Sequence, residues 1–382
     1  MSHSPCYYGQ NRSRPATNRA SDFFRISELG FRISGSARRG VAPFLFLLLC
    51  WLVVGCGQPK ERLNVFIWSD YIDPKIVADF EKEFGCKVTL DLYEDNESML
   101  AKLAGGGVAL YDIVVPSDYV MTAMIKRGLL APLRHEHLPN FVNIDPQFSN
   151  LAFDPSNQFS VPYQWGTVGL YMRKQKDKAI EGTWALVFDP GQQPGPFLLM
   201  DDMRSCFAAA LKFKGHSANS TDPKELAEAR DLLLAAKQRS LGFEGTVGGK
   251  NRVLAKGAVM AVVTSGDAAR GMNEDPETQY VVPREGSDIW VDNLCIPAKA
   301  PHRDLAEKFI NYILDAKVGA RLSNFNQFAT PNKAAYPFIK PADLQNPAIY
   351  PPASFMQHLE VLHDLGEKNR LYDELWTQVK AK

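Results

Sequence analysis

The sequence predicts an α/β protein with largely parallel strands, arranged as two lobes. From Leu63 onward, apolar runs of strand length alternate with amphipathic runs of helical period, and this alternation is typical of repeated βα units. A chain of 382 residues is too long for one small core and suits two bodies of ordinary domain size. Hydrophobic residues make up 45% of the chain and charged residues 23%, which excludes disorder for most of it.

The N-terminal segment has the pattern of a secretory signal. Two arginines precede the apolar run VAPFLFLLLCWLVV, which ends just before Cys56 and is short for a bilayer span of about 20 residues. The end of the run, VVGC, is similar to a bacterial lipobox. We expect a lipoprotein signal peptide over 38–56, lipidation of Cys56 and a polar tether over 57–62, with an uncleaved signal anchor as the alternative. Residues 1–37 are predicted to be a disordered extension or a misassigned start.

The first lobe opens with three βα repeats. The strand LNVFIW is followed by Asp73 and Pro74, which suit the N-cap and first turn of a helix that stops at Gly85. The strand KVTLDLY precedes a helix over about 97–104. YDIVVP is the third buried strand, and Ser117 begins the next helix.

The second lobe repeats this design after a long crossing strand, FSVPYQWGTVGLYMRK. GPFLLMDDMRSCFAAALKF reads as a strand, a turn rich in carboxylates and a helix, and Asp222 caps a helix that ends near Gln238. GAVMAVVTSGDAAR is another strand, turn and helix. After IWVDNLCIP come the helix DLAEKFINYILDAK and a C-terminal helix near DELWTQVKAK. The predicted lobes are residues 63–164 with 291–336 and residues 165–290 with 337–382.

Charge and cysteine content narrow the possible partners. Seven of the 43 basic residues but only two of the 43 acidic ones precede Cys56, so the body of the protein is mildly acidic. This balance argues against a nucleic-acid partner and is compatible with cationic ligands. Cys86, Cys206 and Cys295 are widely spaced without a CxxC pattern, which allows at most one disulfide and no sulfur-rich metal site. We expect buried free thiols.

Several sequence motifs typical of enzymes and metal sites are incomplete or absent in this chain. EGTVGGKN has Glu244 where a phosphate loop needs its first glycine and Asn251 where it needs Ser or Thr, so a flexible loop is expected. His135 and His137 lack a third ligand and are interpreted as part of an exposed polar loop. No GxSxG nucleophile elbow occurs. No metal and no cofactor are expected. The failed motifs argue against an enzyme but do not exclude one.

Aromatic and acidic side chains gather at the ends of the predicted strands. They are Trp68, Asp70, Tyr71, Ser117, Tyr119, Asp201, Asp202, Asp267, Trp290 and Asp292. A ligand that carries separated ammonium groups on an apolar chain needs this mixture, because carboxylates bind the charges and aromatic faces cover the methylenes. Each residue has a structural alternative: the tryptophans as core residues, Ser117 and Asp202 as helix N-caps, and Asp267 as a turn cap.

At these residues the chain resembles the periplasmic spermidine/putrescine-binding proteins of bacterial polyamine ABC transporters. The resemblance runs from Leu63 to the C-terminus through the blocks WSDYIDP, YEDNESMLAKL, YDIVVPSDY, FDPSNQFSVPYQWGT, LLMDDMR, STDPKEL, IWVDNLCIP and ATPNKAA. It implies the type II periplasmic-binding-protein fold, whose two lobes are joined by crossing strands and close over a ligand in the cleft between them.

The resemblance also implies a set of ligand-binding residues. They are Trp68, Ser69, Asp70, Tyr71, Ser117, Tyr119, Asp202, Asp267, Trp290, Asp292 and Phe328. Among them Asp292 is the expected ammonium anchor, and Trp68 and Trp290 are the expected walls around the carbon chain. Three positions depart from the family: Ser205 replaces a glutamate, Thr264 a tryptophan and Phe328 a tyrosine. These departures leave the choice of polyamine open.

The function implied is that of an extracytoplasmic, lipid-anchored and monomeric binding protein. It would capture putrescine or spermidine and hand it to a membrane permease without chemistry or cofactor. Two alternatives stay open. One is a binding protein of the same fold for another small ligand, such as an amino-acid derivative, which Ser205 and Thr264 would serve. The other is an enzyme that uses Asp202 and Asp292 as an acid/base pair.

Overall fold

The computed structural model describes residues 61–175 and 180–381. The signal peptide and the lipidation of Cys56 expected from the sequence lie outside these residues. Within them, no helix combines the length and the apolar character that crossing a membrane requires.

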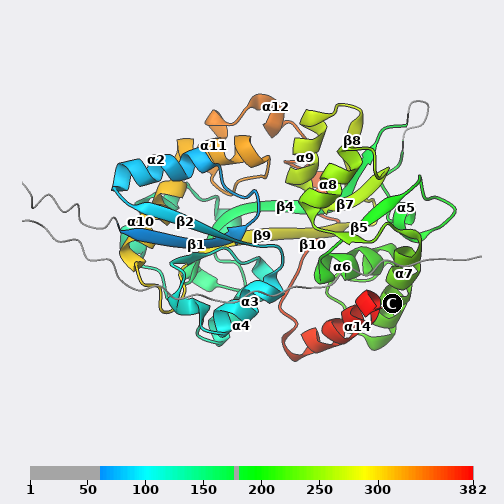
Figure 1. Ribbon diagram of the computed structural model, residues 1–382, viewed down its shortest axis with the longest axis horizontal. Helices are drawn as coiled ribbons and strands as arrows, with labels where there is room; N and C mark the ends of the chain where they lie inside the picture. The colour runs from blue at the N-terminus through cyan, green and yellow to red at the C-terminus, as the bar shows by residue number, and fades with distance from the viewer. Residues whose placement is uncertain (1–60, 176–179, 382) are drawn as a thin grey trace, which may run out of the picture. The chain divides into compact units, whose positions relative to one another are not determined.

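The described residues form ten strands and a set of α-helices and short 3₁₀ helices (Figure 1). The strands are β1 (Arg62–Trp68), β2 (Lys87–Tyr93), β3 (Ile113–Val114), β4 (Ser160–Arg173), β5 (Phe197–Met200), β6 (Phe243–Glu244), β7 (Met260–Thr264), β8 (Thr278–Val281), β9 (Ser287–Cys295) and β10 (Leu359–Val361). The α-helices are α2 (Pro74–Phe84), α3 (Asn96–Ala104), α4 (Asp118–Lys126), α5 (Ala185–Phe188), α6 (Met203–Phe213), α7 (Pro223–Arg239), α8 (Thr246–Leu254), α9 (Ser265–Glu274), α10 (Arg303–Ile313), α11 (Ala316–Asn326), α12 (Pro341–Leu344), α13 (Ala353–Met356) and α14 (Asn369–Ala381). The 3₁₀ helices are η1 (Gly107–Ala109), η2 (His135–His137), η3 (Pro139–Asn143), η4 (Pro146–Phe148), η5 (Pro155–Asn157), η6 (Lys333–Phe338) and η7 (Gly366–Lys368).

The strands are parallel in the outer parts of the sheet and antiparallel at its centre. The order is β2-β1-β3-β9-β4-β7-β5-β6, with β8 also paired to β4 and β10 to β9. β1 is parallel to β2 and β3, and β5 is parallel to β6 and β7. β4 is antiparallel to β9, β7 and β8. The α/β prediction is therefore confirmed, but the expectation of largely parallel strands fails around β4, which has only antiparallel partners among the described strands. β9 is antiparallel to β3 and β4 and parallel to β10.

β4 is the long crossing strand that the sequence predicts. Its first part, from Ser160 to Thr167, pairs with β9, and its second part, from Val168 to Met172, pairs with β7. β4 and β9 run side by side through the described body and connect its two halves (Figure 1). Two of the three predicted lobe boundaries fall within this pair, where Gly166 lies opposite Trp290, and the third falls in η6. The boundary positions themselves stay a prediction.

The first βα unit forms from local signals and the burial of both strand faces. Leu63 and Val65 belong to the core cluster beneath α2, and Phe66 belongs to the cluster beneath α3 and α4 on the opposite face. The Asp73 carboxylate accepts a hydrogen bond from Lys75 N at 2.8 Å, which caps α2. Gly85 ends the helix with φ 66°, a conformation that glycine adopts without steric penalty.

Two segments differ from the sequence prediction. The helix expected over DLAEKFINYILDAK is divided, because α10 ends at Ile313 and Asp315 caps the start of α11. The glycine-rich stretch EGTVGGKN, expected to be a flexible loop, forms most of helix α8. A Cβ on Gly249 would lie 3.2 Å from both the Ala261 Cβ and the Val263 Cγ1 of β7. The glycine therefore permits close packing of helix on strand, and the sequence reading mistook this small residue for a sign of flexibility.

The cysteine prediction is confirmed for two of the three described cysteines. Cys206 and Cys295 are free thiols, and Cys86, Cys206 and Cys295 are all buried.

Candidate ligand-binding site

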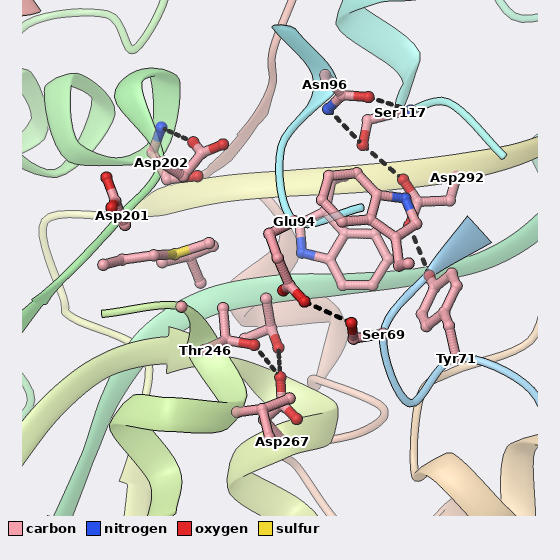
Figure 2. A pocket seen from close by; sticks show the side chains of 18 of the residues that line it. Ser69, Tyr71, Glu94, Asn96, Ser117, Asp201, Asp202, Thr246, Asp267 and Asp292 are labelled. Carbon is pink, nitrogen blue, oxygen red and sulfur yellow. Dashed lines mark hydrogen bonds between the residues drawn. The ribbon is translucent and has the colours of Figure 1, made fainter. Parts of the chain in front are cut away.

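A cavity lies where side chains from strand ends and helix starts of both halves meet beside β4 and β9 (Figure 2). All the predicted ligand-binding residues except Asp70 line it. The lining also includes polar residues that the sequence reading did not place in the ligand-binding set: Glu94, Asn96, Asp201, Ser205, Thr246, Thr264, Arg270 and Asp288.

Asp70 does not line the cavity, although its neighbours do. It has φ 54° and is exposed, so the chain turns sharply here after β1. Ser69 and Tyr71 line the cavity on either side of this turn. The structure therefore does not bring Asp70 together with the other predicted residues.

Asp292 is a buried carboxylate that accepts a hydrogen bond from a neutral hydroxyl on each of its two oxygens. Ser117 Oγ donates to its Oδ1 and Tyr71 OH donates to its Oδ2, each at 2.6 Å (Figure 2). The residue is 5% exposed and has no ion-pair partner in the described part of the chain. Burial raises the pKa of Asp292 to about 7, although both hydrogen bonds oppose the shift. A cation in the cavity would supply the missing counter-charge.

Asn96 holds Ser117 in position through two hydrogen bonds. The Asn96 amide donates from Nδ2 to Ser117 Oγ at 3.1 Å and accepts from Ser117 N at 3.2 Å. Ser117 precedes α4 but makes no side-chain cap hydrogen bond there. The alternative that Ser117 serves as a helix N-cap therefore does not apply, because its hydroxyl is directed to Asp292. Asn96 carries no sequence signal beyond its place in the block YEDNESM.

Two indoles contribute to the apolar part of the cavity. Trp68 donates from Nε1 to the Val115 carbonyl at 2.9 Å, and its ring centroid lies 4.6 Å from that of Tyr93. Trp290 lies with its ring centroid 5.3 Å from that of Phe328 in an edge-on arrangement. Trp290 Nε1 is buried without a partner among the described residues. Both indoles are only partly buried, which leaves surface for a ligand.

Two glycines make room for these walls. A Cβ on Gly166 would lie 2.6 Å from Trp290 Cζ2, and a Cβ on Gly266 would lie 2.4 Å from Phe328 Cδ1. Real Cβ atoms do not approach other atoms so closely. Glycine at both positions is therefore required for the observed ring placement.

Two other carboxylates already have basic partners. Asp267 forms an ion pair with Arg270 and accepts hydrogen bonds from Thr246 and, at 2.7 Å, from Thr264. Asp201 forms an ion pair with Lys380 at 2.7 Å. Thr264, one of the departures from the family pattern, thus helps to hold Asp267.

A second group of carboxylates lies around Ser205. Asp202 is the N-cap of α6 and accepts from Ser205 N at 2.8 Å, so its helix-capping alternative applies. Ser205 Oγ donates to Asp288 Oδ2 at 2.9 Å. Burial raises the pKa of Asp288 to about 6, although the hydrogen bond from Ser205 lowers it. Asp288 is a lining residue that the sequence reading missed.

Of the two histidines, His137 forms part of an ion network outside this cavity, whereas His135 Nε2 lies 2.9 Å from the Asn157 carbonyl oxygen. Ligand atoms of His137, Asp304 and Glu307 lie within 4.8 Å of one another, a grouping that resembles a metal site. The Arg134 guanidinium, however, pairs with both carboxylates, with its Nε 2.9 Å from Glu307 Oε1. Arg303 adds a second cation at 3.3 Å from Glu307. The two arginines therefore already supply the positive charge that a metal ion would bring to this cluster. The exposed polar loop expected at His135 and His137 forms the 3₁₀ helix η2.

The two-half α/β fold, the crossing strands and the cavity beside them define a solute-binding protein of the two-lobed type. Residues 75–352 match the family described as bacterial extracellular solute-binding protein. The chain belongs to this family, and the predicted fold class is confirmed. Membership in this family also supports an extracytoplasmic location.

Individual relatives show which kind of solute-binding protein the chain resembles. The putrescine/cadaverine-binding protein of Pseudomonas aeruginosa is 35% identical over 353 residues, which cover 88% of this chain and 99% of the relative. A Listeria monocytogenes structure described as a spermidine/putrescine ABC transporter is 36% identical with a TM-score of 0.79, covering 84% of this chain and 99% of that one. A lipoprotein of Treponema pallidum is 26% identical with a TM-score of 0.74 and coverages of 84% and 100%. The resemblance to polyamine-binding transport proteins is thus confirmed.

Proposed function

We propose that this protein captures an aliphatic polyamine, putrescine or spermidine, in the cavity beside β4 and β9 and delivers it to the permease of an ABC transporter. The observation that carries this proposal is Asp292, a buried carboxylate without a basic partner among the described residues, which lines the same cavity as Trp68 and Trp290. The curated relatives are named for binding these same amines.

The physical chemistry of a polyamine matches the lining. An ammonium group on Asp292 would form a charge-assisted hydrogen bond and remove the electrostatic penalty of the buried carboxylate. Each methylene transferred from water to the cavity contributes about 0.8 kcal/mol. A cation over an indole face contributes a further ~0.5–2 kcal/mol. A neutral or anionic ligand would gain only the binding free energy that comes from burying its apolar groups.

Calorimetric titration tests the proposal. The chain from residue 57 onward is titrated with putrescine, cadaverine, spermidine and spermine, and with 4-aminobutyrate as an amino-acid derivative that carries one ammonium and one carboxylate. Saturable binding of a polyamine, with no heat from 4-aminobutyrate, is expected. Binding of 4-aminobutyrate alone would contradict the proposal and favour a same-fold protein for another ligand.

The proposed role involves no chemical step. The relatives are named as transport-associated binding proteins, and Asp202, one member of the suggested acid/base pair, caps α6. Prolonged incubation with the bound polyamine should return it unchanged by mass spectrometry. A new product would support the enzyme alternative instead.

We further propose that the protein is a monomer anchored to the membrane through lipidated Cys56. The apolar run that ends at this cysteine and the lipoprotein relative from Treponema pallidum support the anchor. Growth with a labelled fatty acid should label the protein, and Cys56→Ala should abolish the label. Light scattering of the chain from residue 57 onward should give the mass of one chain.

A further inference from the structure

Ser205, one of the positions expected from the sequence to depart from the family pattern, lines the cavity next to Asp202. The structure shows what the serine does. Its Oγ donates a hydrogen bond of 2.9 Å to Asp288, which is 1% exposed and lines the same cavity. A carboxylate therefore reaches this part of the cavity from β9 rather than from α6.

The alternation of β9 places this carboxylate relative to Asp292. Successive side chains of a strand point to opposite faces, so Asp288, Trp290 and Asp292 share one face, and all three line the cavity. The intervening Ile289 and Val291 belong to the core cluster with Leu63 and Val65. One strand thus presents an indole between two carboxylates.

We infer that Asp288 is the second ammonium anchor of the site, so that a diamine lies along β9 with its two charges on Asp288 and Asp292 and its methylenes over Trp290. This inference rests on the proposed function and adds to it a residue and a ligand length. Asp202, which lies beside Ser205, and Asp292 lie toward opposite sides of the cavity in Figure 2.

The spacing along the strand sets the length of the ligand. Four residues at about 3.3 Å each separate the two positions by roughly 13 Å. A charge-assisted hydrogen bond of about 2.8 Å at each end leaves roughly 7 Å between the two ammonium nitrogens. An extended chain advances about 1.3 Å per bond, so this distance suits an aliphatic diamine of four or five carbons.

The charges of the neighbouring groups distinguish Asp288 from two other carboxylates of the cavity, Asp267 and Asp201. Asp267 and Asp201 are paired with Arg270 and Lys380. Asp288, by contrast, has only the neutral hydroxyls of Ser205 and Ser287 as side-chain donors in the described residues. Asp202 lies close enough to disfavour its charged form further. A ligand ammonium would therefore relieve more unfavourable electrostatics at Asp288 than at either paired carboxylate.

Asp288→Asn tests the inference because asparagine keeps the shape and can still accept the Ser205 hydrogen bond. Affinity for putrescine should fall at least ~30-fold, as for loss of one partner of a buried charge pair. Affinity for butylamine, whose single ammonium occupies Asp292, should change less than about threefold. Asp231→Asn makes the same charge change on an exposed residue that pairs with its neighbour Arg230, and it should leave both affinities unchanged.

The double variant Ser205→Glu with Asp288→Asn moves the carboxylate from β9 to α6, where the family has it. Recovery of putrescine affinity in this variant would support the inference and exclude a folding defect as the cause of the loss. An unchanged putrescine affinity in Asp288→Asn, or equal losses for putrescine and butylamine, would overturn the inference while the proposed function stands. Binding of spermidine or spermine without binding of any diamine by the unaltered protein would overturn the inference alone. Absence of binding of every polyamine would overturn both.

Discussion

Ser117 Oγ donates a 2.6 Å hydrogen bond to Asp292 Oδ1 across 175 residues of sequence. The backbones of the two residues also form an isolated antiparallel bridge. Because Tyr71 binds the second carboxylate oxygen, the orientation of Asp292 is fixed from two sides. An anchor that is already oriented loses little conformational entropy when a ligand binds.

Asp292→Asn should reduce putrescine affinity by about 100-fold or more, because the ligand ammonium loses its charged partner in a buried site. Butylamine should lose affinity as well, which distinguishes this variant from Asp288→Asn. Isothermal titration calorimetry measures both affinities. Wild-type affinity for putrescine in this variant would remove Asp292 from the site.

Polyamine affinity should rise with pH between about 5 and 8. The raised pKa of Asp292, about 7, means that the carboxyl is largely protonated at pH 5, whereas aliphatic amines stay cationic over this whole range. The dication therefore displaces a proton when it binds below pH 7. Titrations in buffers of different ionisation enthalpy should show proton release at pH 6, and a release close to zero would contradict the assignment.

The stability of the unliganded protein should fall as pH rises, whereas the polyamine affinity should increase. Asp292 has its folded pKa raised from 3.8 to about 7, so the folded state binds a proton that the unfolded state has lost. Its contribution is fully present below about pH 4 and is lost as pH rises toward 7, at about 1.4 kcal/mol per pH unit. The amide that Asp292→Asn introduces does not titrate, so this pH dependence should be absent from the variant.

Urea unfolding of wild type and Asp292→Asn at pH 4.5, 5.5, 6.5 and 7.5 checks this sign. The stability difference should shift in favour of the variant as pH rises through this window. A difference that is independent of pH would show that Asp292 titrates normally.

Gly166→Ala should destabilise the fold and weaken polyamine binding. The new Cβ would lie 2.6 Å from Trp290 Cζ2 and 2.8 Å from Ser265 Oγ, so the indole must move. Overpacking of this kind costs about 1–3 kcal/mol. Thermal unfolding and calorimetry measure the two effects. Gly257→Ala is the matched control, because its Cβ would meet only ordinary contacts, the nearest at 3.5 Å.

Glu307→Gln should destabilise the protein by about 1–2 kcal/mol without changing polyamine affinity, because a buried hydrogen-bonding carboxylate is lost. The buried Glu307 carboxylate binds the Arg134 guanidinium, which keeps Asp304 as a partner in the variant. Denaturant unfolding and calorimetry give the two readings. Addition of zinc to the wild-type protein should not raise its melting temperature, because Arg134 and Arg303 already neutralise the cluster. A rise would identify a metal site there.

Local signals in the sequence were sufficient for most elements of the fold. The N-caps Asp73 and Asp222 are observed where proline follows them, because capping depends on residues close in the chain. α8 was missed for the converse reason: Gly249 is needed for packing against β7, a contact that no local pattern displays.

The sequence alone predicts that aromatic and acidic side chains lie at strand ends, because the βα alternation shows where each strand stops. Which carboxylates keep an uncompensated charge emerged only from the folded arrangement. The fold paired Asp201 with Lys380 across 179 residues, set Ser205 beside Asp288 across 83 residues and turned Asp70 away from the cavity. The physical reason is that electrostatic energy depends on distance and burial in space, and neither follows from separation along the chain.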